Sequence, residues 1–270
     1  MNMYLRTVKN LFCVPKCVGC NERLSPIASK EKFYGNVILC PSCEEKWNLS
    51  LADMCRECGH DASGCTCFPK FFKSNQETVP SVMFYSSNKD TVCERMIRHL
   101  KHRKNVQLIS FLSNSLAKQL RDELFRIGTT PSSCVYTYVP RKRSSVGKYG
   151  FDQGKELCTE ISKILGGQTL PVFTRIGGRE QKKLNKRDRA KNIKKSIILN
   201  SNLHGFPGEY KGKDLTEAIG GRTVIIIDDV MTSGATLKHC ASIIREKSSN
   251  IPIFVACIAK TPIESKASVE

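Results

Sequence analysis

The sequence predicts an α/β protein in which helices cover both faces of a parallel sheet, preceded by a small cysteine-rich module. Two apolar segments, 222–227 and 251–259, have the composition of strands that are buried on both faces. A segment with helical spacing, 234–247, connects them. Apolar strands that alternate with helices are typical of parallel sheets. Ahead of them, nine of the fourteen cysteines lie within the first 67 residues, which marks a separate module.

Composition and charge indicate a globular chain with an anionic partner. The 270 residues suit one ordinary domain plus a small one. No apolar run approaches the roughly 18 residues of a membrane helix, and the N-terminus lacks a signal-peptide core, so we expect a cytoplasmic protein. The formal net charge of +18 is well above the roughly 2 to 8 of a small domain. Such an excess favours nucleic acid, an anionic membrane surface or a phosphorylated substrate as the partner.

Changes in composition divide the chain into three segments. The cysteine pairs end near Phe68, and a mixed stretch closed by Pro80 follows. The predicted boundaries are 1–68 for the cysteine module, 69–80 for a linker and 81–270 for the α/β domain. Further strands are expected at 81–87, 134–139, 169–175 and 196–199. Helices are expected over 89–125, with a break near 101–105, and over 151–165, and an irregular connection over 200–220.

Eight of the N-terminal cysteines form four closely spaced pairs, which predicts two zinc sites. In a chain without a secretory signal, such pairs indicate metal ligands rather than disulfides. Reduced structural or redox cysteines are the alternative. Two Cys-x-x-Cys turns complete one tetrahedral site. Taken in order, the ligand sets are Cys17, Cys20, Cys40 and Cys43, then Cys55, Cys58, Cys65 and Cys67. A crossed pairing, or His60 in place of Cys65 or Cys67, stays open. The expected role of zinc is to hold together a segment too short for its own core.

The stretch "VIIIDDVMTSGATL", residues 224–237, runs from an apolar strand through two acids into a hydroxyl-rich loop. Ligands of parallel sheets bind beyond the carboxyl ends of the strands. Asp228 and Asp229 can there hold sugar hydroxyls or a hydrated magnesium ion. Amides and hydroxyls at the start of the next helix form an anion site, contributed by Thr232, Ser233, Gly234, Ala235 and Thr236. A ligand with a phosphate close to a diol is a ribose 5-phosphate. The alternative interpretation of this stretch is a helix cap that follows an acidic strand end and binds no ligand.

This stretch resembles the phosphoribosyl pyrophosphate (PRPP) motif of the type I phosphoribosyltransferases. Three other segments resemble the ComF family. "YGFDQGKEL", 149–157, is similar to its Gly-Phe-Asn-Gln motif, although Tyr149 and Asp152 stand where the family usually has Arg and Asn. "REQKKLNKRDRAKNI", 179–193, is similar to a Gln-x-x-Leu-x4-Arg-x-x-Asn pattern, and "IRHLKHRKN", 97–105, to an upstream segment centred on Lys101. The cysteine pairs are similar to the family's zinc ribbon.

The resemblance implies a type I phosphoribosyltransferase-like sheet behind zinc ribbons, in a competence protein that contacts single-stranded DNA during its uptake in natural transformation. It implies that Asp228, Asp229 and Arg189 have the catalytic roles, with Mg²⁺ accompanying PRPP. The further PRPP contacts that it implies are Gln181 and Asn192, and the charges of Arg141, Lys142 and Arg189 are expected to stabilise the leaving pyrophosphate. The alternative is an active phosphoribosyltransferase that moves ribose 5-phosphate from PRPP to an unidentified base or nucleophile. In that case the zinc ribbons are structural or dock a partner such as the competence helicase.

The segment 175–195 carries ten Lys or Arg and two acids. It contains no aromatic residue, so contact with nucleic-acid phosphates is favoured over base stacking. A solvated loop is the alternative, since runs of charge are commonly exposed to water.

Overall fold

Five parallel strands form the main sheet, in the order β1-β7-β6-β2-β3. This computed structural model describes residues 16–24, 38–73, 76, 78–85, 91–176, 196–200 and 214–262. The strands are β1 (Ser81–Phe84), β2 (Val135–Tyr138), β3 (Gln168–Thr169), β6 (Val224–Met231) and β7 (Ile253–Lys260). The two apolar segments thus form the longest strands, β6 and β7, which pair with each other near the middle of the sheet. The predicted parallel sheet is confirmed.

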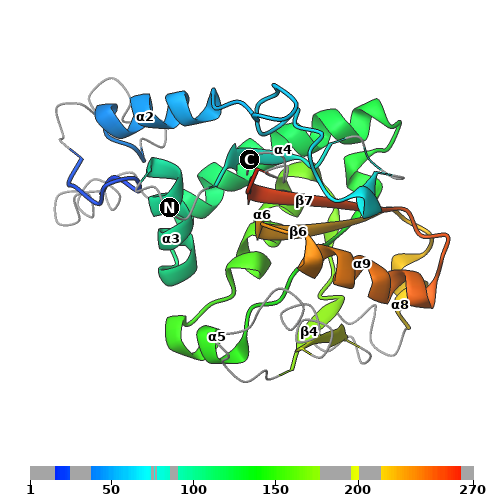
Figure 1. Cartoon of the computed structure of the whole chain (residues 1–270). Helices are drawn as coiled ribbons and strands as arrows, with labels where there is room; N and C mark the ends of the chain where they lie inside the picture. The colour runs from blue at the N-terminus through cyan, green and yellow to red at the C-terminus, as the bar shows by residue number, and fades with distance from the viewer. Residues whose placement is uncertain are drawn as a thin grey trace, which may run out of the picture.

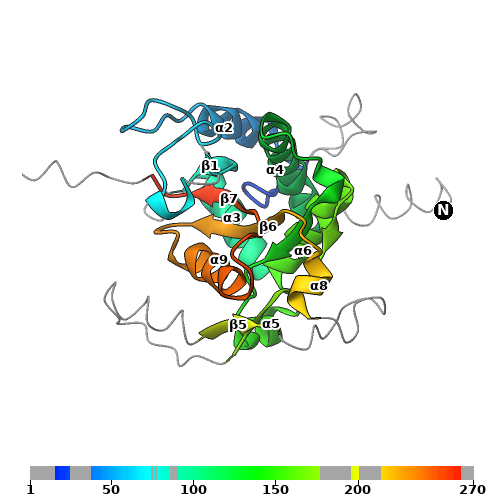
Figure 2. The same cartoon turned by 90° about the vertical axis from the view of Figure 1, so that its right-hand side faces the viewer.

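Side chains on β6 alternate between two hydrophobic cores. Ile225 and Ile227 share one core with residues of α3 (Val92–His102), α4 (Val106–Arg126) and α6 (Gln153–Leu165). Val224 and Ile226 share the other core with residues of α8 (Leu215–Ile219) and α9 (Ala235–Lys247). Successive side chains of a strand face opposite sides, so helices cover both faces of the sheet, as predicted. Figures 1 and 2 show α9 on one side of β6 and α4 and α6 on the other.

The helices on the α4 side begin at capping residues. Thr91 accepts a hydrogen bond from the Glu94 amide at the start of α3, and Asn105 accepts one from Leu108 at the start of α4. Between them the backbone is extended at Arg103, which ends α3. The predicted break near 101–105 is therefore confirmed.

Several elements differ from the sequence-based expectations. The expected strand at 169–175 is two strands, because Pro171 separates β3 from β4 (Phe173–Arg175). β4 pairs antiparallel with β5 (Ile197–Leu199) in a separate two-stranded sheet. Five helices or turns of the described residues were not expected: α2 (Pro41–Leu51), η1 (Lys70–Phe72), η2 (Pro131–Ser133), α5 (Arg143–Tyr149) and α8, whose capping box joins Asp214 and Glu217.

The cysteine-rich segments pack directly on the α/β domain. Val18 and Leu39 belong to the same core as α3 and α4, and the Trp47 ring of α2 lies 5.3 Å from the ring of Phe111 on α4. Figure 1 shows α2 running over the helices of this face. Among the helices that the structure describes, none combines the length and the apolar composition needed to cross a membrane.

Candidate functional site

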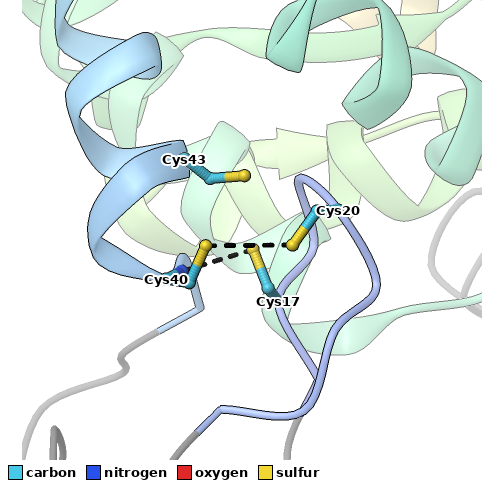
Figure 3. Close-up of side chains that lie close together, drawn as sticks. All are labelled: Cys17, Cys20, Cys40 and Cys43. Atoms are coloured by element: carbon cyan, nitrogen blue, oxygen red, sulfur yellow. Dashed lines mark hydrogen bonds between the residues drawn. The ribbon is translucent and has the colours of Figure 1, made fainter.

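The first four predicted zinc ligands converge at one point. A turn carries Cys17 and Cys20, and the start of α2 carries Cys40 and Cys43, so that the four sulfurs face one another (Figure 3). All four lie within 4.8 Å of one another, and the Sγ atoms of Cys20 and Cys40 are 3.8 Å apart. A tetrahedral site with Zn–S bonds of about 2.3 Å requires S···S distances of about 3.8 Å, so the set fits zinc.

A glycine in the first turn allows this convergence. A Cβ atom at Gly19 would lie 2.9 Å from the Sγ of Cys43 and 3.2 Å from a methyl carbon of Leu39. Any larger residue would therefore push the turn away from α2 and open the set of sulfurs.

The other four predicted ligands, Cys55, Cys58, Cys65 and Cys67, form a second set whose sulfurs also lie within 4.8 Å of one another. The structure thus groups the eight cysteines in chain order rather than in the crossed arrangement. His60 is not in the set; a hydrogen bond with Cys58 instead raises the pKa of its imidazole. The two tetracysteine sets could bind two zinc ions, and four protein ligands leave no open position, which is typical of structural zinc.

The thiols of the second set differ in acidity. Burial raises the pKa of Cys65 to about 11. Burial acts in the same direction on Cys58, but hydrogen bonds from the backbone of His60 and Thr66 outweigh it and lower the pKa of Cys58 to about 5. One thiolate is therefore present at neutral pH, while a neighbour stays protonated until a cation stabilises its charge.

The second cysteine set is bonded to the edge of the sheet. The side chain of Lys260, at the end of β7, is 1% exposed and donates to the backbone carbonyls of Cys65 (3.1 Å) and Val79 (3.4 Å). Ser81 on β1 donates to the carbonyl of Ala62 at 2.8 Å. These bonds fix the position of the second set relative to the carboxyl ends of the strands.

The two acids lie in the last half of β6, which continues four residues beyond the expected end at 227. On one side β2 stops at Tyr138, which pairs with Ile227. On the other side β7 continues to Lys260, which pairs with Met231. Asp228 and Asp229 are therefore part of the strand rather than beyond it, and they follow the last pair that joins β6 to β2.

Two polar side chains orient Asp229. Its Oδ2 atom lies 3.6 Å from the ammonium of Lys101 on α3 and accepts a 3.2 Å hydrogen bond from Gln153 at the start of α6. Asp229 is 8% exposed, so these contacts compensate a largely buried carboxylate. Lys101 belongs to the segment singled out in the sequence, and the structure places its ammonium beside the acid pair.

Asp228 is poorly stabilised as a carboxylate. Burial, followed by the negative charge of Asp229, raises its pKa above the ordinary value for Asp. Its Oδ1 atom accepts a hydrogen bond from the Asp229 amide at 2.8 Å. A cation or hydroxyl donors bound here would stabilise the ionised form.

The loop after β6 ends at a glycine in the left-handed conformation, which an L-residue adopts only with strain. Gly234 caps α9 with a φ of +68°, and a Cβ there would lie 2.7 Å from the Cγ of Pro69 and 3.5 Å from the ring of Phe72. Pro69 and Phe72 come directly after the second cysteine set. Thr232 and Ser233 are exposed beside it, and Ala235 and Thr236 are half-buried in the first turn of α9.

The other predicted ligand contacts have different surroundings. The guanidinium of Arg141 donates to the backbone carbonyls of Phe151 and Lys101. Lys142 is exposed at the N-cap of α5. Their contact with pyrophosphate stays a prediction. Gln181, Arg189 and Asn192, with most of the segment 175–195, lie outside the described residues.

Sequence reasoning assigned no contact with the acids to Gln153 or Arg175. Gln153 stands in the stretch "YGFDQGKEL", which was already singled out in the sequence, so this residue could have been named as a candidate site residue. Arg175 ends β4, where burial lowers the pKa of its guanidinium and the charge of Asp228 opposes that shift. The sequence did offer a signal for Arg175, because a cationic residue stood at the carboxyl end of a predicted strand.

Asp152, which stands where the resembled motif has Asn, has a structural role. Its Oδ1 accepts from the amides of Gly154 (2.9 Å) and Lys155 (3.2 Å) and so caps α6, and its Oδ2 accepts from the Arg141 amide at 2.8 Å. An Asn has one acceptor oxygen and could make only some of these hydrogen bonds, whereas the two carboxylate oxygens of Asp152 accept all three.

Fold and sites together define the class: an α/β protein with a parallel sheet and two N-terminal tetracysteine metal sites. Comparison with models of known protein families gives no match, and comparison with curated proteins gives none either.

Proposed function

We propose that the chain is a ComF-type competence protein that binds PRPP, or a related ribose 5-phosphate, at the end of β6 and contacts single-stranded DNA during its uptake in natural transformation. One observation carries the proposal: adjacent carboxylates on a central parallel strand are followed within three residues by a hydroxyl-rich loop that opens a helix. A diol and a phosphate on one ligand match these two groups in that order.

The environment of the two acids supports a ribose ligand. Lys101 and Gln153 occupy the Oδ2 atom of Asp229 and hold this side chain in one orientation. Desolvation and the charge of Asp229 raise the pKa of Asp228, while part of the residue is still exposed, so hydroxyl donors or a cation can reach its carboxylate and stabilise the ionised form.

Magnesium fits this site only together with the ligand. The pair supplies at most two carboxylates, and the groups of three or more metal-binding side chains in the described residues are both tetracysteine sets. Mg²⁺ is commonly held by one or two carboxylates plus substrate phosphates. Asp228 and Asp229 would hold such an ion, directly or through its water shell, and it would neutralise pyrophosphate charge.

Charge supports the DNA contact. A net charge of +18 attracts a polyanion, and phosphate contacts supply most non-specific affinity for nucleic acids. The two tetracysteine sets would act as structural zinc sites that hold the N-terminal segments on the α/β domain.

Thermal unfolding in the presence of PRPP, ribose 5-phosphate and Mg²⁺, beside an oligothymidylate titration, tests the proposal. PRPP with Mg²⁺ should raise Tm by several degrees when present at about 100 times its Kd, since this corresponds to about 2.7 kcal/mol. Pyrophosphate release in the same samples would favour the alternative of an active phosphoribosyltransferase. The absence of a Tm increase with PRPP at millimolar concentration would overturn the proposed pocket.

A further inference from the structure

Aromatic rings and a guanidinium stack where the end of α3 meets α5. The ring of His102 lies 5.0 Å from that of Tyr149, with 27° between their planes. The guanidinium of Arg141 lies 4.6 Å from the centre of the Tyr149 ring and 5.5 Å from that of Phe151. Phe151 is buried, Tyr149 is half-buried and His102 is exposed. The stack therefore starts in the core and ends in solvent at His102.

Cations surround the exposed end of this stack. Burial, and then the charges of Arg141, Lys148, Lys101 and Arg98, lower the pKa of His102. The imidazole is thus an uncharged ring at neutral pH, set among permanent positive charges. Arg98, Lys148 and the neighbouring Arg143 are exposed.

The described carboxylates next to these residues already have partners. Asp152 caps α6 and accepts from the Arg141 amide at 2.8 Å. Glu156 accepts from Lys104 at 2.6 Å. Lys101 pairs with Asp229, and among the described residues no carboxylate pairs with Lys148 or Arg143 on α5.

We propose that this junction binds single-stranded DNA, with one base stacked on His102 and backbone phosphates on Lys148 and Arg143. The inference rests on the DNA contact in the proposed function and gives that contact a location and a mode. Single-strand-binding surfaces combine cationic grooves with aromatic rings, because every base has a face that can stack whatever its sequence. The basic segment 175–195 lacks such rings and supplies phosphate contacts alone.

The junction adjoins the acid pair. Lys101 precedes His102 on α3, and its ammonium lies 3.6 Å from Asp229. Arg141, within the stack, donates to the carbonyl of Lys101. DNA bound on His102 would therefore lie next to the wall of the proposed PRPP pocket.

Fluorescence anisotropy with two labelled probes of equal length tests the stacking. One probe is oligothymidylate, and the other consists of abasic sugar-phosphate units, which keep the charge and lack the bases. His102→Ala should weaken oligothymidylate binding about tenfold and leave the abasic probe almost unchanged, whereas His102→Phe should retain both affinities. Equal affinity of His102→Ala and the wild type for oligothymidylate, or an equal loss for both probes, would overturn the stacking.

Charge reversal tests the phosphate contacts. Lys148→Glu with Arg143→Glu should weaken both probes at least tenfold and reduce the salt dependence of binding. The control, Lys118→Glu with Lys163→Glu, makes the same change in net charge on exposed residues of α4 and α6 and should have a much smaller effect. Equal losses in the two double variants would reject this location. Zinc content and Tm of every variant show whether it is folded.

These outcomes separate the location from the proposed function. If the wild type binds DNA and the junction variants bind it equally well, the junction is rejected as the location, and the DNA contact of the proposed function is retained. A wild-type protein that binds neither probe removes the DNA contact itself, and PRPP binding is then still decided by its own titration.

Discussion

The buried ammonium of Lys260 donates a hydrogen bond to the backbone carbonyl of Cys65, 3.1 Å away. Lys260 ends the strand β7 and pairs in register with Met231 on the central strand β6, and the Thr261 amide donates to the carbonyl of Met231 at 2.9 Å. Burial lowers the pKa of Lys260, and the nearby cysteines, Cys65 first, oppose this shift. A zinc ion with four thiolates carries a net negative charge, so Lys260 is placed to compensate it. The second cysteine set is thereby connected to the strand that carries the acid pair.

Lys260→Met is expected to loosen the second zinc site selectively. The substitution removes the positive charge beside four thiolates and leaves two carbonyls without their donor, which costs roughly 1–3 kcal/mol for such groups. Zinc release to a colorimetric chelator should become faster for one of the two ions, and Lys163→Met, at an exposed position, should release both as the wild type does. Unchanged release kinetics in Lys260→Met would show that the lysine does not stabilise the site.

The two zinc sites should differ in their effect on the ligand pocket. Metal analysis should give two equivalents of zinc per wild-type chain and about one in Cys20→Ser or Cys58→Ser. Pro69 and Phe72 follow the second set and pack on Gly234, so Cys58→Ser should weaken the thermal stabilisation by PRPP. Cys20→Ser, in the first set, should leave PRPP binding measurable. An equal loss in both variants would contradict a separate link between the second site and the loop.

Gly234→Ala should destabilise the protein more than Gly221→Ala. Both glycines have a positive φ, +68° and +72°, which costs an L-residue about 1–2 kcal/mol. A Cβ at Gly221 meets nothing within 4 Å, whereas one at Gly234 meets Pro69 at 2.7 Å. Urea unfolding should give a loss of about 1 kcal/mol for Gly221→Ala and at least twice that for Gly234→Ala. Similar losses would mean that Pro69 moves away at little cost.

Asp228→Asn is expected to stabilise the protein at neutral pH. The pKa of Asp228 is raised in the folded state, so folding favours the protonated form and wild-type stability falls as pH rises through the range between the unfolded and folded pKa values. Below about pH 4, the usual pKa of Asp, both states are protonated and the advantage of the variant should disappear. Tm measured from pH 3 to pH 8 checks this, and a difference that does not depend on pH would contradict it.

The basic segment 175–195 remains a predicted phosphate contact. Changing Lys182, Lys183, Lys186 and Arg187 to Glu should weaken single-strand binding without regard to sequence. Each lost contact should reduce the slope of log affinity against log salt by about 0.7. Unlike His102→Ala, this variant should lose affinity for the oligothymidylate probe and for the abasic probe to the same extent. A DNA affinity and slope equal to those of the wild type would assign the segment to a solvated loop.

Local sequence signals predicted the local parts of the structure. The apolar runs at β6 and β7 and the close spacing of the cysteines depend on neighbours within a few residues, and both expectations were confirmed. The expected strand at 169–175 was wrong because Pro171 interrupts it, although that proline was visible in the sequence. β6 extends beyond its predicted end at residue 227, because β7 still pairs with the segment that carries the acids.

Contacts between distant segments could not be predicted. Gln153 and Asp229 are 76 residues apart, and Lys260 and Cys65 are 195 apart. Their meeting depends on how helices and cysteine turns pack on the sheet, which no spacing along the chain encodes. The same holds for the stack of His102 on Tyr149. These residues lie in the segments 97–105 and 149–157, and nothing in the sequence indicates that the two segments meet.

The most direct test of the central claim is calorimetric titration of PRPP with Mg²⁺ into the wild type and into Asp228→Asn with Asp229→Asn. The double variant should remain folded, because removing adjacent like charges relieves repulsion, and it should lose PRPP binding. Asp122→Asn, at an exposed position on α4, should bind as the wild type does. PRPP binding of equal affinity in the double variant would contradict the assignment of the pocket to the acid pair.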